Sequence, residues 1–311
     1  MRIAVAVFLL TVLFSVQSQA AEDAVLTLPT GRLYGTVEIP AGVRKPPVAL
    51  IIAGSGPTDR NGNNRFAGRN DSLKQLAESL AENGIASLRY DKRGIGASRE
   101  LATAEKDLRI EHYIDDAVFW GEYLLLSGRF GKLTVIGHSE GALIGAAAAE
   151  KLNADGFVSI AGVGRPAYTV IEEQFEKFPA FKNEVKRINE HLKKGDTVGS
   201  ISPELMPAFR PDIQPYVISW YRYNPAEITG RLRMPVLIVQ GTTDIQVSVS
   251  DAELLAKSNK KARLAILKDV NHVMKEAGAD MKQQQESYTN PAYPVSPKVT
   301  EAVAGFIKGL N

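Results

Sequence analysis

A serine flanked by glycines is the best candidate nucleophile in this chain. The segment Gly137–Gly141 reads Gly-His-Ser-Glu-Gly and lies between an apolar run, Leu133–Ile136, and an alanine-rich helical stretch, Glu140–Leu152. A tight turn from a strand into a helix strains the backbone of its serine, and the flanking glycines relieve the crowding. Such a turn exposes the Ser139 hydroxyl at the carboxyl edge of a sheet and directs a helix N-terminus at developing negative charge. The alternative, an inert serine in a glycine-rich turn, is disfavoured by this strand-turn-helix context.

A serine hydroxyl needs a base to take its proton, and the chain offers four histidines. His138 adjoins Ser139, and successive side chains point apart. His112 lies within a predicted helix, and His191 is predicted to be exposed to solvent on another helix. His272 follows a predicted strand, on a loop at the sheet edge where Ser139 also emerges. We therefore predict that His272 is the base.

The base in turn needs an acidic partner that fixes its tautomer and stabilises its charged form. Asp244 follows the predicted strand Val236–Gln240, again at the carboxyl edge of the sheet. Its alternative role is to shape a turn or cap a helix. Asp269 is the rival acceptor, three residues before His272, but it is placed more like the end of its own strand. We predict Asp244 as the partner.

Backbone N–H groups must stabilise the oxyanion that forms when a serine attacks a carbonyl. The N–H of Glu140 lies at the start of the predicted nucleophile helix. A second donor is expected from the loop after the buried strand Val48–Ala53, and the N–H of Ser55 is the candidate. Each such donor contributes about 10²–10³ in rate.

Cofactor chemistry is disfavoured by the same loop and by composition. Gly54-x-Gly56 after a strand hints at a dinucleotide-binding turn, but Asp59 stands in place of the third glycine and Pro57 prevents an immediate helix. The chain has no cysteine, which excludes disulfides, thiolate nucleophiles and Cys-ligated metals. With 37 basic and 35 acidic residues there is no charge excess to attract nucleic acid. We predict no cofactor and no metal.

The elements that must position these residues alternate between strand and helix, which predicts an α/β fold with a mostly parallel central sheet flanked by helices. Asp71 and Ser72 are expected to cap the first helix, which runs to about Glu82. The predicted strands are Val25–Leu28, Leu33–Ile39, Val48–Ala53, Ala86–Tyr90, Leu133–Ile136, Phe157–Ile160, Val236–Gln240 and Arg263–Leu267, and the other helices are Ile110–Leu126, Glu140–Leu152, Ser250–Ser258 and Pro297–Gly309.

One segment, at about residues 163–232, breaks this alternation. It has helical patterning without a strand, and aromatic residues concentrate in it. These aromatic residues could form a small core of the segment's own. The functional interpretation is a helical cap over a pocket, inserted into a single domain of residues 21–311.

Residues 1–20 are predicted to be a signal peptide. Arg2 precedes an apolar run, Ile3–Val16, and the small residues Ser18 and Ala20 suit signal peptidase. The alternative is an uncleaved anchor, but the run is shorter than the roughly 20 residues that a membrane-spanning helix needs. No other segment is long and apolar enough to span a bilayer. We expect an exported protein, periplasmic or secreted, with no membrane span after cleavage.

Taken together, these segments resemble the α/β-hydrolase superfamily. The order Ser139, Asp244, His272 is the order of that family. Arg89–Ser98 (RYDKRGIGAS) is also similar, and the loop Gly54–Gly62 looks like the GSGPxDR segment of exported bacterial carboxylesterases and serine aminopeptidase-like hydrolases. The resemblance implies an α/β-hydrolase fold with a cap, and supporting roles for Asp91 and Arg93 beside the nucleophile turn. Ala53 departs from the histidine that many relatives carry there.

The resemblance and the triad imply acyl transfer to water. A small-molecule carboxylic ester, with a short to medium acyl chain, is the expected substrate because an alkoxide leaves more easily than an amine. A serine aminopeptidase or amidase is the alternative, with Glu172, Glu173 and Glu176 available to hold a substrate amino group. A second alternative is a non-catalytic binding protein on the same scaffold. The sequence leaves the oligomeric state open.

Overall fold

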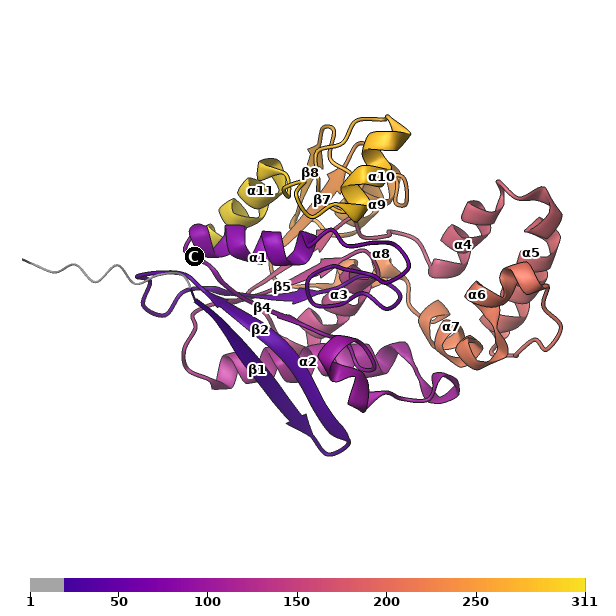
Figure 1. Cartoon of the computed structure of the whole chain (residues 1–311), viewed down its shortest axis with the longest axis horizontal. Helices are drawn as coiled ribbons and strands as arrows, with labels where there is room; N and C mark the ends of the chain where they lie inside the picture. Colours follow the sequence, from indigo (N-terminus) through magenta and orange to yellow (C-terminus); the bar gives the residue numbers. More distant parts are fainter. Residues whose placement is uncertain (1–19, 311) are drawn as a thin grey trace, which may run out of the picture.

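The computed structural model describes residues 20–310, and its centre is an eight-stranded sheet (Figure 1). The strand order is β1-β2-β4-β3-β5-β6-β7-β8; β1 pairs antiparallel with β2 and β2 with β4, while all other pairs are parallel. This confirms the predicted mostly parallel sheet. The strands are β1 (Ala20–Leu28), β2 (Gly31–Ile39), β3 (Val48–Ile52), β4 (Ala86–Tyr90), β5 (Leu133–His138), β6 (Gly156–Ile160), β7 (Val236–Gly241) and β8 (Ala262–Leu267).

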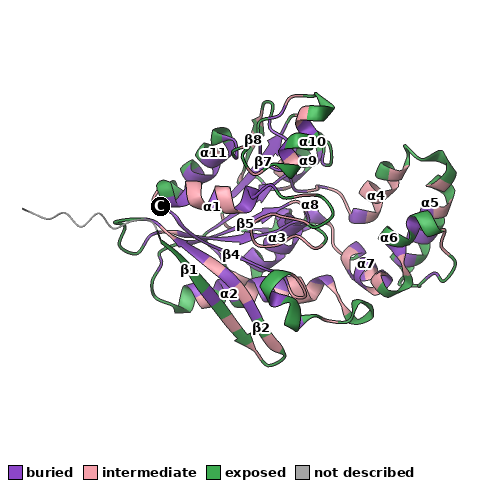
Figure 2. Ribbon diagram, viewed as in Figure 1, coloured by how far each residue is buried: buried purple, intermediate pink, exposed green. Residues whose placement is uncertain are grey.

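The sequence determines which strands lie at the centre. Every residue of β3, β4, β5, β6 and β7 is buried, as continuous apolar runs in a sheet covered on both faces require. The edge strands β1 and β8 include exposed residues. Figure 2 shows the buried residues gathered in the sheet and on the helix faces turned toward it.

Helices cover both faces of the sheet. On one face, α1 (Ser72–Glu82) and α11 (Pro297–Lys308) bury leucine, valine and phenylalanine side chains in a shared apolar cluster. On the other face, α2 (Ile110–Leu126), α3 (Glu140–Leu152), α8 (Pro225–Arg231) and α9 (Val249–Ser258) contribute to a second and larger cluster. A further helix, α10 (Met281–Thr289), was not predicted, and neither were the short 3₁₀ turns at Gly96–Leu101, Glu105–Asp107, Pro203–Leu205 and Pro211–Ile213.

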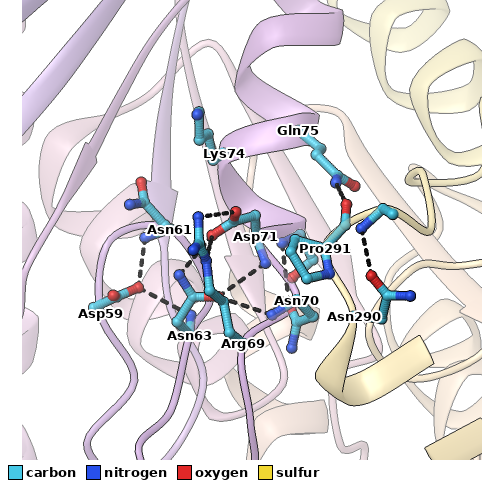
Figure 3. A network of polar contacts seen from close by, with 12 residues as sticks. Asp59, Asn61, Asn63, Arg69, Asn70, Asp71, Lys74, Gln75, Asn290 and Pro291 are labelled. Atoms are coloured by element: carbon cyan, nitrogen blue, oxygen red, sulfur yellow. Dashed lines mark hydrogen bonds and ion pairs between the residues drawn. The ribbon is translucent and has the colours of Figure 1, made fainter. Parts of the chain in front are cut away.

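The loop between β3 and α1 is built by side-chain hydrogen bonds (Figure 3). Asp59 Oδ1 accepts from the N–H groups of Asn61 and Asn63 at 2.8 and 2.9 Å. Asp71 occupies the N-cap position of α1, as predicted, but its side chain does not cap the helix: its backbone is left-handed (φ 52°), and its carboxylate accepts from Asn63 Nδ2 and Arg69 instead of a helix N–H. The carboxylates therefore stabilise the loop, and the helix begins beside it at Ser72.

The chain between β6 and β7 is helical. It contains α4 (Ala167–Phe175), α5 (Pro179–Lys194), α6 (Met206–Phe209) and α7 (Gln214–Tyr221) before α8, and α4–α7 extend away from the sheet layers (Figure 1). Phe209 and Tyr221 are buried, and Tyr221 Oη donates to Asn189 Oδ1 at 2.6 Å. Several aromatic residues of this segment are thus buried, in the same apolar cluster as α2 and α3. We refer to residues 163–232 as the insert.

Within residues 20–310, no helix combines the length and the apolar character that a bilayer crossing would demand. The predicted signal peptide falls outside the described residues, except for Ala20, which begins β1.

Candidate active site

Ser139 lies in a strained turn between β5 and α3. Its backbone has φ 55° and ψ −123°, and its N–H donates to the Ile160 carbonyl at 2.9 Å. A Cβ at Gly137 would overlap the Gly141 carbonyl, and one at Gly141 would overlap the carbonyls of Ile52 and Ala53. Glycine is therefore required on both sides of the serine. Ser139 lines a cavity of about 220 Å³.

The structure brings His272 and Asp244 together. His272 follows β8 and Asp244 follows β7, and His272 Nδ1 lies 2.8 Å from Asp244 Oδ2. Both side chains are buried. Asp269, the rival acceptor, is exposed, and its N–H donates to Thr242 Oγ1 at the end of the strand. The bond to His272 thus comes from the aspartate that the sequence favoured.

Asp244 is held by four hydrogen bonds. Its Oδ1 accepts from the N–H groups of Gln246 and Val247, and its Oδ2 accepts from His272 and from Gln240 Nε2 at 3.0 Å. Burial by itself would raise the pKa of Asp244, but the attraction of His272 and these hydrogen bonds outweigh it and lower the pKa. The side chain is therefore an ionised, fixed acceptor. Gln240, the last but one residue of β7, was not singled out from the sequence.

The two predicted oxyanion donors border the same cavity as Ser139. Ser55 and Glu140 both line it, and within the described part of the chain neither residue's N–H donates to another protein group. The rest of the wall is mainly apolar and comes from α3, the insert and the loop after β7. It consists of Leu143, Val163, Ala167, Val170, Ile171, Trp220, Pro225 and Val247, with Arg165, Gln174 and Gln246 as its polar members.

Known hydrolases and esterases are similar to this chain in sequence and in fold. Residues 63–208 match the family described as serine aminopeptidase, S33. The esterase EstD of Thermotoga maritima is 30% identical over 250 residues, which are 78% of this chain and 58% of that protein, so the chain spans a little over half the length of this relative. Est1E from Butyrivibrio proteoclasticus superposes with a TM-score of 0.59 at 18% identity, over 93% of this chain and 98% of that one. A thermophilic esterase from Thermogutta terrifontis gives 0.57 at 16% identity, over 93% and 99%.

This chain has the α/β-hydrolase fold.

The segment after β4 stabilises the loop that carries Ser55. Asp91 accepts from the Arg60 backbone N–H at 2.8 Å and from its guanidinium at 2.9 Å. Arg93 forms a bidentate pair with Asp116 of α2. Asp91 thus supports the loop, as the resemblance implied, whereas Arg93 ties the same segment to α2.

The other three histidines have roles away from proton transfer at the serine. The ring of His138 contacts the backbone of His272, with Nε2 2.8 Å from its carbonyl oxygen. Burial lowers the pKa of His138 to about 4, so this ring is neutral near pH 7 and donates to that carbonyl. His112 accepts from the Arg109 N–H at the start of α2, and His191 is exposed on the insert. His138 therefore fixes the backbone of the candidate base.

Proposed function

We propose that this α/β-hydrolase cleaves carboxylic esters of short acyl chains through an acyl-enzyme on Ser139. The observation that carries the proposal is the buried, hydrogen-bonded His272–Asp244 pair at the same sheet edge as a strained Ser139, which lines a small and mainly apolar cavity. The relative named as an esterase, 30% identical, supports the same reaction class. We also propose that residues 1–20 direct export of the protein.

In the proposed reaction, the Ser139 hydroxyl attacks the ester carbonyl as His272 takes its proton. The oxyanion forms against the N–H groups of Ser55 and Glu140. When the tetrahedral intermediate collapses, the bond to the alcohol oxygen breaks and His272 returns the proton to that oxygen. Water then adds to the acyl-enzyme with the same base, and the acid leaves as Ser139 regains its proton.

The cavity favours an ester over an amino-terminal peptide. A peptidase of that kind needs a free carboxylate to hold the substrate ammonium group. Glu173 is ion-paired with Arg165 at 2.6 Å, Glu172 accepts from Asn189, and Glu176 pairs with Lys182. These are the three glutamates that the sequence offers for the aminopeptidase alternative. None of them lines the cavity, and each is held by another side chain of the insert, so the ester is the better interpretation.

Hydrolysis of p-nitrophenyl esters from acetate to palmitate tests the proposal. The cavity of about 220 Å³ is smaller than the roughly 300–1,000 Å³ of most ligand pockets, so we expect the highest kcat/KM at about six acyl carbons or fewer. Leucine p-nitroanilide is expected to be at least about 100-fold slower, because its leaving group is an amine. A faster anilide would favour the aminopeptidase, and no turnover of either class would favour a binding protein.

Val170→Trp is expected to shorten the acyl chains that the enzyme accepts. Val170 lies on α4 and lines the cavity, so an indole there takes up space that an acyl chain would fill. We expect kcat/KM for p-nitrophenyl hexanoate to fall by about tenfold or more, and that for acetate to change by less than about threefold. Thr169→Trp adds the same bulk one residue earlier, outside the cavity wall, and should preserve the chain-length profile. An unchanged profile in Val170→Trp would place the acyl chain elsewhere.

A further inference from the structure

A buried lysine contacts the loop that carries Ser55, one of the two proposed oxyanion donors. Lys92 follows β4 and is 1% exposed. Its ammonium donates to the Gly54 carbonyl at 2.5 Å and lies 3.8 Å from a carboxylate oxygen of Glu140. It also stands over the ring of Tyr113, 5.2 Å from the centroid. Burial lowers the pKa of Lys92, and the carboxylate of Glu140 opposes that shift.

The carbonyl that Lys92 holds belongs to the same peptide group as the Ser55 N–H. A trans peptide is planar, and its C=O and N–H point in opposite directions. An ammonium fixed on the Gly54 oxygen therefore fixes the direction of the Ser55 N–H. A hydrogen bond to the carbonyl also polarises the amide and strengthens its N–H as a donor. Gly54 packs directly against the nucleophile, since a Cβ there would lie 3.1 Å from Ser139 Cβ.

Glu140, whose N–H is the other proposed oxyanion donor, contacts the same lysine. Its backbone N–H is the donor at the start of α3, and its buried side chain pairs with Lys92. The other carboxylate oxygen accepts from Tyr216 Oη of the insert at 2.6 Å. An uncompensated carboxylate at this position would repel the developing oxyanion. Lys92 supplies the opposing charge, and Tyr216 a hydrogen bond.

We propose that Lys92 is a positioning residue of the oxyanion site, which orients the Ser55 N–H through the Gly54 carbonyl and neutralises the Glu140 carboxylate beside the Glu140 N–H. This inference rests on the proposed function, because an oxyanion forms only if Ser139 attacks a carbonyl. Lys92 touches neither donor N–H itself and acts through the groups that carry them.

Steady-state kinetics of Lys92→Met with p-nitrophenyl butyrate test the inference. We expect kcat to fall about 10- to 100-fold with KM changed by less than about twofold, somewhat less than the loss of a whole oxyanion donor. Lys92→Gln keeps an N–H donor without the charge, and its kcat should lie between those of the wild type and Lys92→Met. A trifluoromethyl ketone forms a tetrahedral adduct with the serine, and its inhibition constant should weaken by about the factor that kcat/KM loses.

Lys275→Met is the matched control. Lys275 is equally buried, and its ammonium also donates to loop carbonyls, those of Asn70 at 2.6 Å and Asn290 at 3.2 Å. Neither peptide carries a proposed oxyanion donor. Both Lys→Met variants should lower the melting temperature, but Lys275→Met should keep kcat within about threefold of wild type.

Two results would overturn the inference while leaving the esterase intact: a folded Lys92→Met variant with wild-type kcat, or equal losses of kcat in Lys92→Met and Lys275→Met. If Lys92→Met does not fold, the same criteria apply to Lys92→Gln. A wild-type protein without turnover that depends on Ser139 would instead remove the proposed function, and this inference with it.

Discussion

Replacing Ser139 by alanine is expected to lower kcat for p-nitrophenyl butyrate by about 10⁶-fold, because members of a working triad act as a unit and no other group can form the acyl-enzyme. Alanine removes only the hydroxyl oxygen and leaves the bond between the backbone N–H of residue 139 and the Ile160 carbonyl in place. The substitution should therefore remove turnover without loss of the fold, which the melting temperature would verify.

Ser159→Ala is the control for the nucleophile variant. Ser159 is a buried serine on β6, and its hydroxyl has no hydrogen-bond partner among the described residues. Removing an unpartnered hydroxyl should leave stability unchanged or slightly higher, and kcat should stay within about twofold of wild type. A Ser139→Ala variant with the wild-type rate would show that the nucleophile is another residue.

The second large effect is expected from Asp244→Asn, with kcat reduced about 10⁴-fold. The amide oxygen can still accept from Gln246 and Val247, but the amide nitrogen would then face His272 Nδ1. This favours the tautomer with the proton on Nε2, which cannot accept the proton of the serine. Steady-state kinetics should show the loss in kcat with little change in KM. The far-ultraviolet circular dichroism spectrum should be unchanged.

Asp269→Asn separates the two acidic candidates. Asp269 is exposed and lies three residues before His272. Asp269→Asn therefore removes one negative charge, as Asp244→Asn does, but from the loop that carries His272. We expect kcat within about twofold of wild type. A larger loss in Asp269→Asn than in Asp244→Asn would reverse the assignment of the acidic partner.

The sheet could be predicted because its central strands are continuous apolar runs. Helix α10 was missed for the opposite reason: Met281–Thr289 is mostly polar, and its buried residues are Gln284 and Ser287. These side chains are tied by hydrogen bonds to Asn271, next to His272. A helix held by polar contacts carries no apolar periodicity for the sequence to reveal.

The candidate site was predicted as far as strand ends and motifs could place it. Ser139, Asp244 and His272 follow three strands whose carboxyl ends share one edge, so topology alone groups them. Lys92 has no such signal. It lies in a polar run between Asp91 and Arg93, and its acceptor, the Gly54 carbonyl, is 38 positions away along the chain. The side chain of Asp71 does not cap the helix for a related reason. Its partners in the loop compete with the helix N–H groups for the carboxylate.

The bond between Tyr216 and Glu140 couples two parts of the chain thermodynamically. Tyr216 belongs to the insert, and Glu140 begins the helix after the nucleophile. Any movement of the insert that separates them leaves the carboxylate with one donor fewer beside the oxyanion site. If a ligand binds more tightly to the protein with this bond intact than to the protein without it, its binding shifts the equilibrium toward the docked insert. By thermodynamic linkage, that shift equals the ratio of the two affinities. The free energy of docking the insert therefore contributes to the binding free energy of any analogue of the tetrahedral intermediate.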